Sequence, residues 1–210
     1  METITIKTDS LPISVDELFN IGPIVIKTNS WKISDENFFN FCQDNELLNI
    51  ERNCNNDIII MPPKGNLISN QNVHISGNLF IWNEKSKLGY TFGSNTGFTL
   101  PNNAVRSPDA AWIEKSRFDK LSQKEKDSFG HICPDFVIEL KSKSNTLNGL
   151  KDKMNEWIEN GCRLAWLINP EEKKVYIYRK DGSISEMDFS EKISGEDVLT
   201  GFEMDLGFMI

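Results

Sequence analysis

The sequence predicts an α/β protein with a mixed β-sheet flanked by helices. The first reason is a strand, helix and strand between residues 136 and 168, a βαβ crossover that normally lays two parallel strands in one sheet. The second is a pair of apolar runs, Leu47 to Glu51 and Asp57 to Met61. The polar segment Asn53-Cys-Asn-Asn separates them, as in a β-hairpin. A sheet that contains both hairpins and a crossover is mixed.

The N-terminal half is expected to begin with an arm. Residues 1–33 alternate loosely and are interpreted as strands or an ordered arm packed on the core, and residues 34–210 as a single domain. Ser34 is expected to cap a helix that runs to about Asp44, because acidic residues fill its first turn. Apolar positions between Asn70 and Trp82 recur at helical spacing, although Gly77 weakens that helix.

Short elements are expected in the middle of the chain, and longer ones toward its end. The middle elements are strands at Gly89–Phe92 and around Phe98, a turn at Asn102–Asn103, a strand from Ala104 to Ile113 interrupted by Ser107-Pro108, and a short helix opened by the capping box Ser122-x-x-Glu125. The later elements are a strand at Phe136–Lys141, a helix from Leu147 to Ile158 stopped by Gly161, and strands at Arg163–Ile168 and Val175–Tyr178.

Composition is that of an ordinary globular protein, with 39% hydrophobic and 26% charged residues. No window approaches the uninterrupted apolar length of a membrane span, and the N-terminus lacks a signal pattern, so a cytoplasmic protein without a membrane partner is expected. The net charge of −8 argues against a protein that coats DNA, because non-specific affinity comes from neutralised phosphates. A local basic face with a narrow footprint stays compatible with that charge.

Cysteine and histidine patterns exclude the common zinc sites. The four cysteines are widely spaced with no C-x-x-C pair, and are interpreted as reduced, mostly buried thiols. The two histidines, His74 and His131, are too far apart in the sequence for a histidine-based metal site. Any metal ligands must therefore be carboxylates, which suit Mg²⁺ or Mn²⁺ better than zinc.

The segment from Pro134 to Lys141 carries the clearest chemical signal. Side chains alternate along a strand, so Glu139 and Lys141 share one face while the other face is wholly apolar. A charged, solvent-exposed face on an edge strand would give the same pattern. However, this strand leads into the crossover, and such strands usually lie inside a sheet.

A second Pro-Asp, Pro108-Asp109, lies at the start of another apolar strand. If the two strands pair, the carboxylates of Asp109 and Glu139 lie close enough to reach one cation. Two adjacent carboxylates repel each other unless a metal or a shared proton lies between them. Lys141 would then orient a water near the metal. The metal lowers the pKa of that water and holds a phosphoryl oxygen. These are the parts that metal-assisted phosphodiester hydrolysis requires.

Asp135 is the alternative ligand. It also follows a proline and shares the face of Glu139, but four strand residues place it roughly 13 Å away, too far for one ion. Asp135 is therefore interpreted as a strand-entry residue or as a residue that supports the metal ligands.

Several segments together resemble a known family, the Uma-two family of bacterial restriction endonucleases in the PD-(D/E)XK nuclease superfamily. The resemblance covers most of the chain, and it is carried by the order of these motifs: the hairpin with Ile50-Glu-Arg and Ile59-Ile-Met-Pro-Pro, Arg106-Ser-Pro-Asp-Ala-x-Trp, Cys133-Pro-Asp-Phe-Val-Ile-Glu-Leu, Leu150-x-x-Lys153-Met and Asn160-Gly-x-Arg-Leu-x-Trp-Leu-Ile-Asn-Pro.

The resemblance implies a restriction-endonuclease-like core with Asp109 and Glu139 as metal ligands and Lys141 as the superfamily lysine. It assigns Lys153, on the crossover helix, to a family lysine that contacts phosphate; a solvated helix lysine is the alternative. The chain departs from the family where an acidic residue is expected near the start of the second helix, and Glu51 is a weak candidate for a third acidic ligand.

These observations lead to a first hypothesis of a Mg²⁺-dependent DNA endonuclease. The second hypothesis is a catalytically silent nucleic-acid-binding or protein-interaction module that keeps the nuclease fold. The third is a homodimer that uses exposed apolar termini such as Phe202 and the Phe208-Met-Ile tail.

Overall fold

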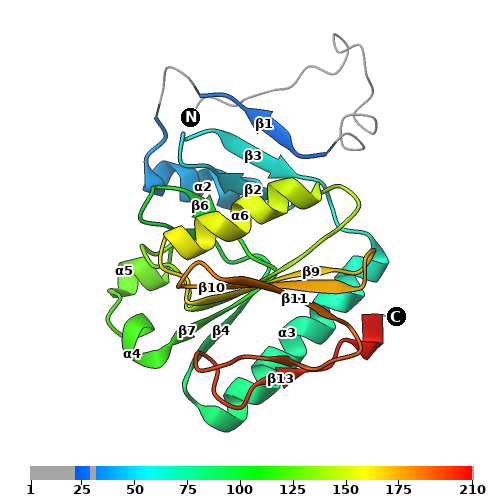
Figure 1. Cartoon of the computed structure of the whole chain (residues 1–210). Helices are drawn as coiled ribbons and strands as arrows, with labels where there is room; N and C mark the ends of the chain where they lie inside the picture. The colour runs from blue at the N-terminus through cyan, green and yellow to red at the C-terminus, as the bar shows by residue number, and fades with distance from the viewer. Residues whose placement is uncertain (1–21, 29–31, 210) are drawn as a thin grey trace.

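A computed structural model of the chain describes residues 22–28 and 32–209 (Figure 1). The strands expected before residue 22 lie outside the described residues. The helices are α2 (Asp35–Asp44), α3 (Asn66–Ser86), α4 (Lys115–Phe118), α5 (Gln123–Lys126) and α6 (Leu147–Glu159), with a 3-10 turn η2 (Gly207–Met209). The strands are β1 (Ile24–Ile26), β2 (Asn49–Arg52), β3 (Ile58–Met61), β4 (Gly89–Gly93), β5 (Phe98–Thr99), β6 (Val105–Arg106), β7 (Ala110–Glu114), β8 (Phe136–Leu140), β9 (Leu164–Asn169), β10 (Lys174–Arg179), β11 (Ile184–Asp188), β12 (Ile193–Ser194) and β13 (Glu203–Met204).

A mixed sheet forms the centre of the fold, with strand order β11-β10-β9-β8-β7-β4. β8 and β9 pair in parallel, and α6 connects them, so the predicted βαβ crossover is confirmed. β7 pairs antiparallel with β8 on the other side, with Ala110 opposite Ile138. β8 is thus an interior strand with every residue buried, and the alternative of a solvent-exposed edge strand is wrong.

Helices cover both faces of this sheet (Figure 1). On one face, α6 buries Leu150, Met154 and Trp157 against side chains such as Val137 of β8. On the other face, α3 and the C-terminal segment pack on Phe136, Ile138 and Leu140 of β8 together with their neighbours. The alternation predicted for β8 is therefore confirmed: its odd and even residues enter two different cores.

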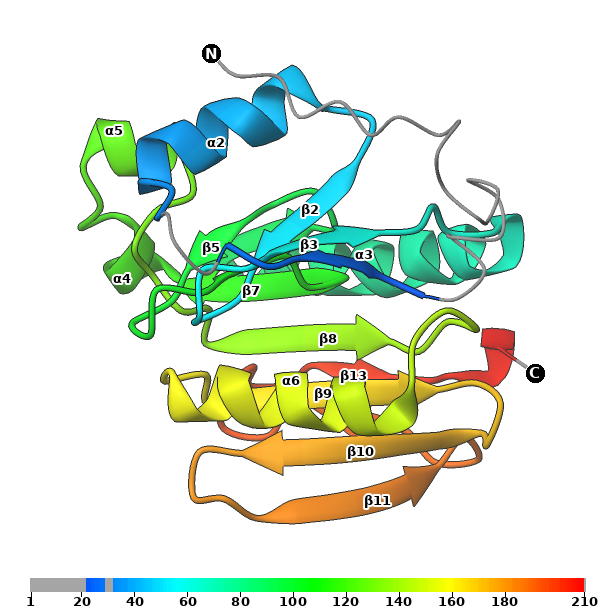
Figure 2. The ribbon, with the colours of Figure 1, turned by 90° about the horizontal axis from the view of Figure 1, so that it is seen from above.

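A second sheet, with strand order β1-β3-β2-β6-β5, lies beside α6 on the same face of the central sheet (Figures 1 and 2). The predicted hairpin is confirmed as β2 and β3, with Ile50 opposite Ile60. β1 adds to it through antiparallel pairing with β3. α2 packs Phe38 against this sheet and begins after Ser34, whose hydroxyl accepts a hydrogen bond from the Asn37 N–H. The domain boundary at residues 33 and 34 stays a prediction.

Two predicted elements differ in extent from those observed, and some observed strands were not predicted. The helix expected at 70–82 runs from Asn66 to Ser86, and Gly77 lies within it. The strand expected from Ala104 to Ile113 is two strands in different sheets, β6 and β7, because Ser107-Pro108 turns the chain from one sheet to the other. The strands after Asp181-Gly182 were not predicted.

Large aromatic side chains fill the core. Trp112, Trp157 and Trp166 are buried in it, and Trp82 is partly buried against it. The expectation that Phe202 is exposed is wrong: it is 2% exposed, and its ring stacks on Trp166 with centroids 5.6 Å apart. Within residues 22–28 and 32–209, no helix has the length and apolar character needed to cross a bilayer.

Candidate active site

Asp109 lies at the start of β7, next to Glu139 of the neighbouring strand. The Asp109 N–H donates to the Ile138 carbonyl oxygen at 3.0 Å, which extends the β7–β8 ladder by one residue and sets Asp109 opposite Glu139. The side chain of Asp109 is 5% exposed. Oδ2 accepts from the Leu140 N–H at 2.7 Å, and Oδ1 accepts from the Asn72 amide at 3.1 Å and from the Lys64 ammonium. Backbone and side-chain donors therefore fix this carboxylate in place.

Glu139 projects toward α6. Its carboxylate is buried, and Oε1 accepts a hydrogen bond from the Trp157 indole N–H at 3.0 Å. The Lys153 ammonium lies 2.8 Å from the same oxygen. Because Trp157 and Lys153 both belong to α6, the crossover helix positions the side chain of Glu139.

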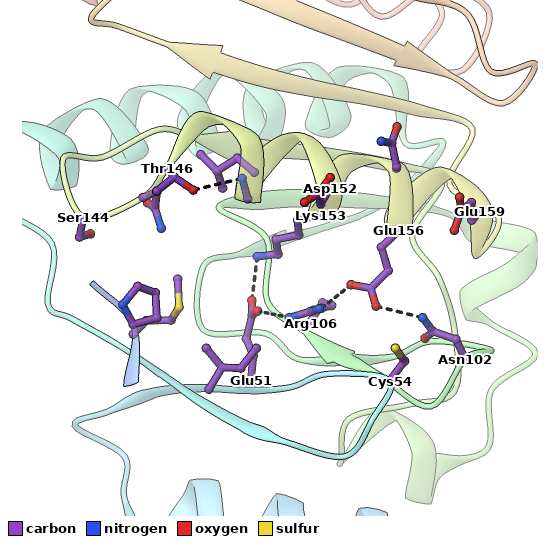
Figure 3. A pocket seen from close by; sticks show the side chains of 17 residues that line it. Glu51, Cys54, Asn102, Arg106, Ser144, Thr146, Asp152, Lys153, Glu156 and Glu159 are labelled. Carbon is purple, nitrogen blue, oxygen red and sulfur yellow. Dashed lines mark hydrogen bonds and ion pairs between the residues drawn. The ribbon is translucent and has the colours of Figure 1, made fainter. Parts of the chain in front are cut away.

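Glu51, on β2 of the second sheet, joins the same group through Lys153. The Lys153 ammonium donates to Glu51 Oε1 at 2.7 Å (Figure 3). The same ammonium pairs with Glu139, so one cation links two buried carboxylates from different sheets. Glu51 also accepts from the Ser107 N–H at 3.0 Å and from the Arg106 guanidinium at 3.0 Å. The Arg106 guanidinium also donates a hydrogen bond to the carboxylate of Glu156, on α6, at 2.6 Å. The alternative that Lys153 is a solvated helix lysine is therefore wrong.

The charges shift the pKa values of this network. Burial by itself would raise the pKa of Glu51, but the charges of Lys153 and Arg106, with hydrogen bonds from Lys153 and Ser107, outweigh it and leave the pKa below its usual value. Burial would likewise lower the pKa of Lys153, yet Glu139 and Glu51 hold it above its usual value. Lys64 differs, because desolvation dominates there and lowers its pKa. Glu51 is thus a carboxylate and Lys153 an ammonium at neutral pH.

One small cavity of about 50 Å³ unites these residues. Three acidic residues, Glu51, Asp109 and Glu139, and two lysines, Lys64 and Lys153, are among the residues that line it. The sequence-predicted pair Asp109 and Glu139 is therefore brought to a common cavity, and Lys153 lies at its wall.

Lys141 and Asp135 lie elsewhere. The Lys141 ammonium bonds Glu171, in the loop after β9, at 2.6 Å, and Lys141 does not line the cavity of Asp109 and Glu139. Asp135, at the entry to β8, pairs with Arg117 at 2.7 Å and accepts from the Glu114 N–H at 2.9 Å. Its contacts are those of a strand-entry residue, one of its two predicted roles.

The donor chemistry fits a hydrated Mg²⁺ or Mn²⁺ ion, held by Asp109 and Glu139. Carboxylate oxygens are the donors these ions prefer, and Mg²⁺ typically takes one or two carboxylates and keeps several waters. In the described part of the chain, no three side chains of His, Cys, Asp or Glu stand together as a ready-made metal cage. Lys64 pairs with Asp109 and Lys153 with Glu139, so a cation on Asp109 would require the Lys64 ammonium to move away from that carboxylate.

Two participants were difficult to find from sequence. Glu51 was only a weak candidate, and its signal was its position on the inner face of the hairpin strand, in the Ile50-Glu-Arg motif. Lys64 was not proposed at all. It follows Pro62-Pro63 in a loop, and nothing local indicates that it reaches Asp109, 45 residues later.

Comparisons with known proteins identify the family and the fold of the chain. A family model, Uma2, described as putative restriction endonuclease, matches residues 35–207. Among solved structures, a putative nuclease belonging to DUF820 from Anabaena variabilis superposes with a TM-score of 0.65 at 16% sequence identity, over 76% of this chain and 88% of that one. No curated protein matches the sequence significantly. The structural likeness shows that the fold is restriction-endonuclease-like.

Proposed function

Because the chain belongs to the Uma2 family, which is described as putative restriction endonuclease, we propose that it is a nuclease that hydrolyses phosphodiester bonds in DNA with Mg²⁺ or Mn²⁺. One observation carries this proposal: Asp109 and Glu139, from adjacent strands, line the same polar cavity together with Lys64 and Lys153. This is a carboxylate pair with cations beside it, as hydrolysis of a phosphodiester requires.

Asp109 and Glu139 would hold the divalent cation. When bound, such an ion polarises a phosphoryl oxygen and lowers the pKa of a coordinated water. The residues of the chain do the positioning. The Leu140 N–H and the Asn72 amide orient Asp109, and the Trp157 indole orients Glu139.

The lysines that line the cavity would contribute positive charge where the phosphate gains negative charge. Lys153 is tethered between Glu51 and Glu139, so its ammonium stays beside the cavity. Lys64 bonds Asp109 and would be free to meet a phosphate oxygen after it releases that carboxylate. Lys141 was expected to position the nucleophile, and that role would require its ammonium to leave Glu171.

Cleavage of plasmid and linear DNA, with Mg²⁺, with Mn²⁺ and with EDTA, tests the proposal. We expect cleavage only with the divalent ions, and its loss in Asp109→Asn and Glu139→Gln. Glu203→Gln is the matched control, because it removes one carboxylate from an exposed position on β13. Unchanged cleavage by Glu139→Gln would overturn the assignment.

A silent module with the same fold is the second candidate function. The observation that favours it is that the carboxylates at the cavity are already paired with ammonium groups. Calorimetric titration with Mn²⁺ separates the two functions. The nuclease predicts binding that Asp109→Asn and Glu139→Gln abolish, whereas a silent module predicts no binding that depends on these residues.

A further inference from the structure

A second hollow, of about 750 Å³, adjoins the active-site cavity. It lies between the N-terminus of α3 and the loops that follow β8 and β9. Pro62, Lys64, Ser142 and Ser144 line both spaces, so the two are neighbours with a shared wall. The volume is within the range of pockets that hold small molecules, which extends from about 300 to 1,000 Å³.

The charge of this hollow is opposite to that of the protein as a whole. Three lysines line it, Lys64, Lys141 and Lys143, against the single carboxylate of Glu171. The chain as a whole carries a net charge of −8. A basic hollow on an acidic protein is a local site for an anion, which meets the sequence-based expectation of a narrow basic footprint.

Another large hollow is the acidic groove between α6 and the second sheet, with a volume of about 670 Å³ (Figure 3). Four carboxylates line that groove, against one guanidinium and one ammonium. Asp152 and Glu159 of α6 are among them, in addition to the paired Glu51 and Glu156. A phosphate group would be repelled by this groove. The basic hollow is therefore the better place for a nucleic-acid strand that leaves the active site.

The N-terminus of α3 adds a positive end to the hollow. Gly65 is its N-cap residue and supplies no side-chain hydrogen bond, and no acidic residue occurs in the first turn. Gly65 and Asn66 both line the hollow. In a 21-residue helix the first backbone N–H groups have no partner within the helix, and they favour an anion.

Gln71 provides an independent indication of a ligand. It lines the same hollow and is 3% exposed, yet its side-chain oxygen has no hydrogen-bond partner within the described residues. A buried amide oxygen without a donor loses the free energy of a hydrogen bond. A ligand that carries an N–H or O–H group would satisfy it, and rotation of the amide would present its N–H₂ donors instead.

We propose that this hollow binds the nucleotide next to the cleaved bond. The lysines and the α3 N-terminus hold its phosphate, Pro62, Pro63 and Leu67 contact its base or sugar, and Gln71 hydrogen-bonds to its polar edge. The inference rests on the proposed nuclease function, since it takes the substrate to be a nucleic acid. Because the two spaces share a wall, a nucleic-acid strand bound at the cavity of Asp109 and Glu139 would continue into the hollow.

Binding measured without cleavage tests the inference. Fluorescence anisotropy of a short fluorescein-labelled DNA, single-stranded and duplex, is followed in EDTA over a range of salt concentrations with the full chain. Lys143→Ala is the main variant, because this exposed loop lysine is not needed for the fold. Lys180→Ala, which removes another exposed lysine, from the turn between β10 and β11, is the matched control. Gln71→Leu probes the buried amide.

We expect Lys143→Ala to weaken DNA binding about 3- to 10-fold. The slope of log affinity against log salt concentration should become shallower by about the amount that one phosphate contact contributes. Gln71→Leu is expected to weaken binding with the salt dependence unchanged, and Lys180→Ala to leave both unchanged. Equal affinities and slopes for Lys143→Ala and Lys180→Ala would overturn the inference, as would equally strong competition by polyglutamate. DNA binding that depends on Lys143 without any metal-dependent cleavage would leave the hollow assigned and refute only the nuclease activity.

Discussion

Replacing Lys153 by methionine tests the central feature of the site, one buried ammonium shared by two buried carboxylates. Methionine keeps most of the stem of the side chain and removes the charge. In the native protein Glu51 and Glu139 are 3% and 4% exposed, and the Lys153 ammonium lies 2.7 and 2.8 Å from their oxygens. Loss of the cation leaves both carboxylates in a space that water reaches poorly.

Removing one partner from a buried ion pair typically costs about 3–5 kcal/mol. Glu51 keeps Arg106 and the Ser107 N–H as partners, so we expect the lower end, about 3 kcal/mol. With a urea dependence of about 2 kcal/mol per M, the unfolding midpoint falls by about 1.5 M. Exposed Lys85, in the last turn of α3, provides the control, because Lys85→Met removes a charge without breaking such a network.

The pH dependence gives an independent check. Because the pKa of Glu51 is lowered in the folded state, its ionisation stabilises the fold above the unfolded pKa of about 4.3, and that stability is lost as the pH falls through the folded pKa. Lys153→Met removes the strongest favourable charge from Glu51. The difference between the wild type and Lys153→Met should therefore be greatest near pH 7 and should narrow below about pH 4.

Urea unfolding followed by circular dichroism in EDTA, at neutral and acidic pH, measures both effects. Equal midpoints for Lys153→Met and Lys85→Met at pH 7 would refute the reasoning. The double variant Lys153→Met with Glu51→Gln should recover part of the loss, because it removes one of the two buried carboxylates that Lys153 no longer neutralises.

Three further outcomes follow from other parts of the fold, and each is measured by urea unfolding. Gly89→Ala should destabilise by about 1–3 kcal/mol, because a Cβ there would overlap the Ile113 carbonyl oxygen and the Trp112 ring, whereas Gly93→Ala on the same strand meets open space and should be close to neutral. Thr146→Ala should lower the free energy of unfolding by about 1 kcal/mol, since the Thr146 hydroxyl caps α6. Thr146→Ser keeps a hydroxyl, so an equal loss of stability in both variants would count against capping. Asp135→Asn should lower the free energy of unfolding by about 2 kcal/mol, because it weakens the contact with Arg117, and should leave Mn²⁺ affinity unchanged. Weaker Mn²⁺ binding with unchanged stability would instead show that Asp135 supports the metal ligands.

Much of the fold could be predicted from sequence because its signals are local. Alternating side chains predicted the two faces of β8, and helical spacing from Leu147 to Ile158 predicted α6. The length of the segment between β8 and β9 then predicted their parallel pairing. Each of these depends on residues within one element or on adjacent elements, where periodicity and turn chemistry dominate.

The short strands β12 and β13 near the C-terminus could not be predicted in this way. Each is two residues long, too short for a periodic pattern, and forms because the chain packs on the core through residues such as Phe202. The break between β6 and β7 was visible as Ser107-Pro108, but its result, a change of sheet, depended on where the partner strands lie.

The sequence by itself determined Asp109 and Glu139 as the candidate ligands, because each sits in a recognisable motif at the start of, or within, an apolar strand. Only the tertiary structure decided which cations lie beside them. Lys153 meets Glu51 across 102 residues of sequence, and Lys64 meets Asp109 across 45, while Lys141, two residues from Glu139, bonds Glu171 instead. The physical reason is that a long, flexible lysine takes the partner that burial and packing place near it, and those partners come from other elements of the fold.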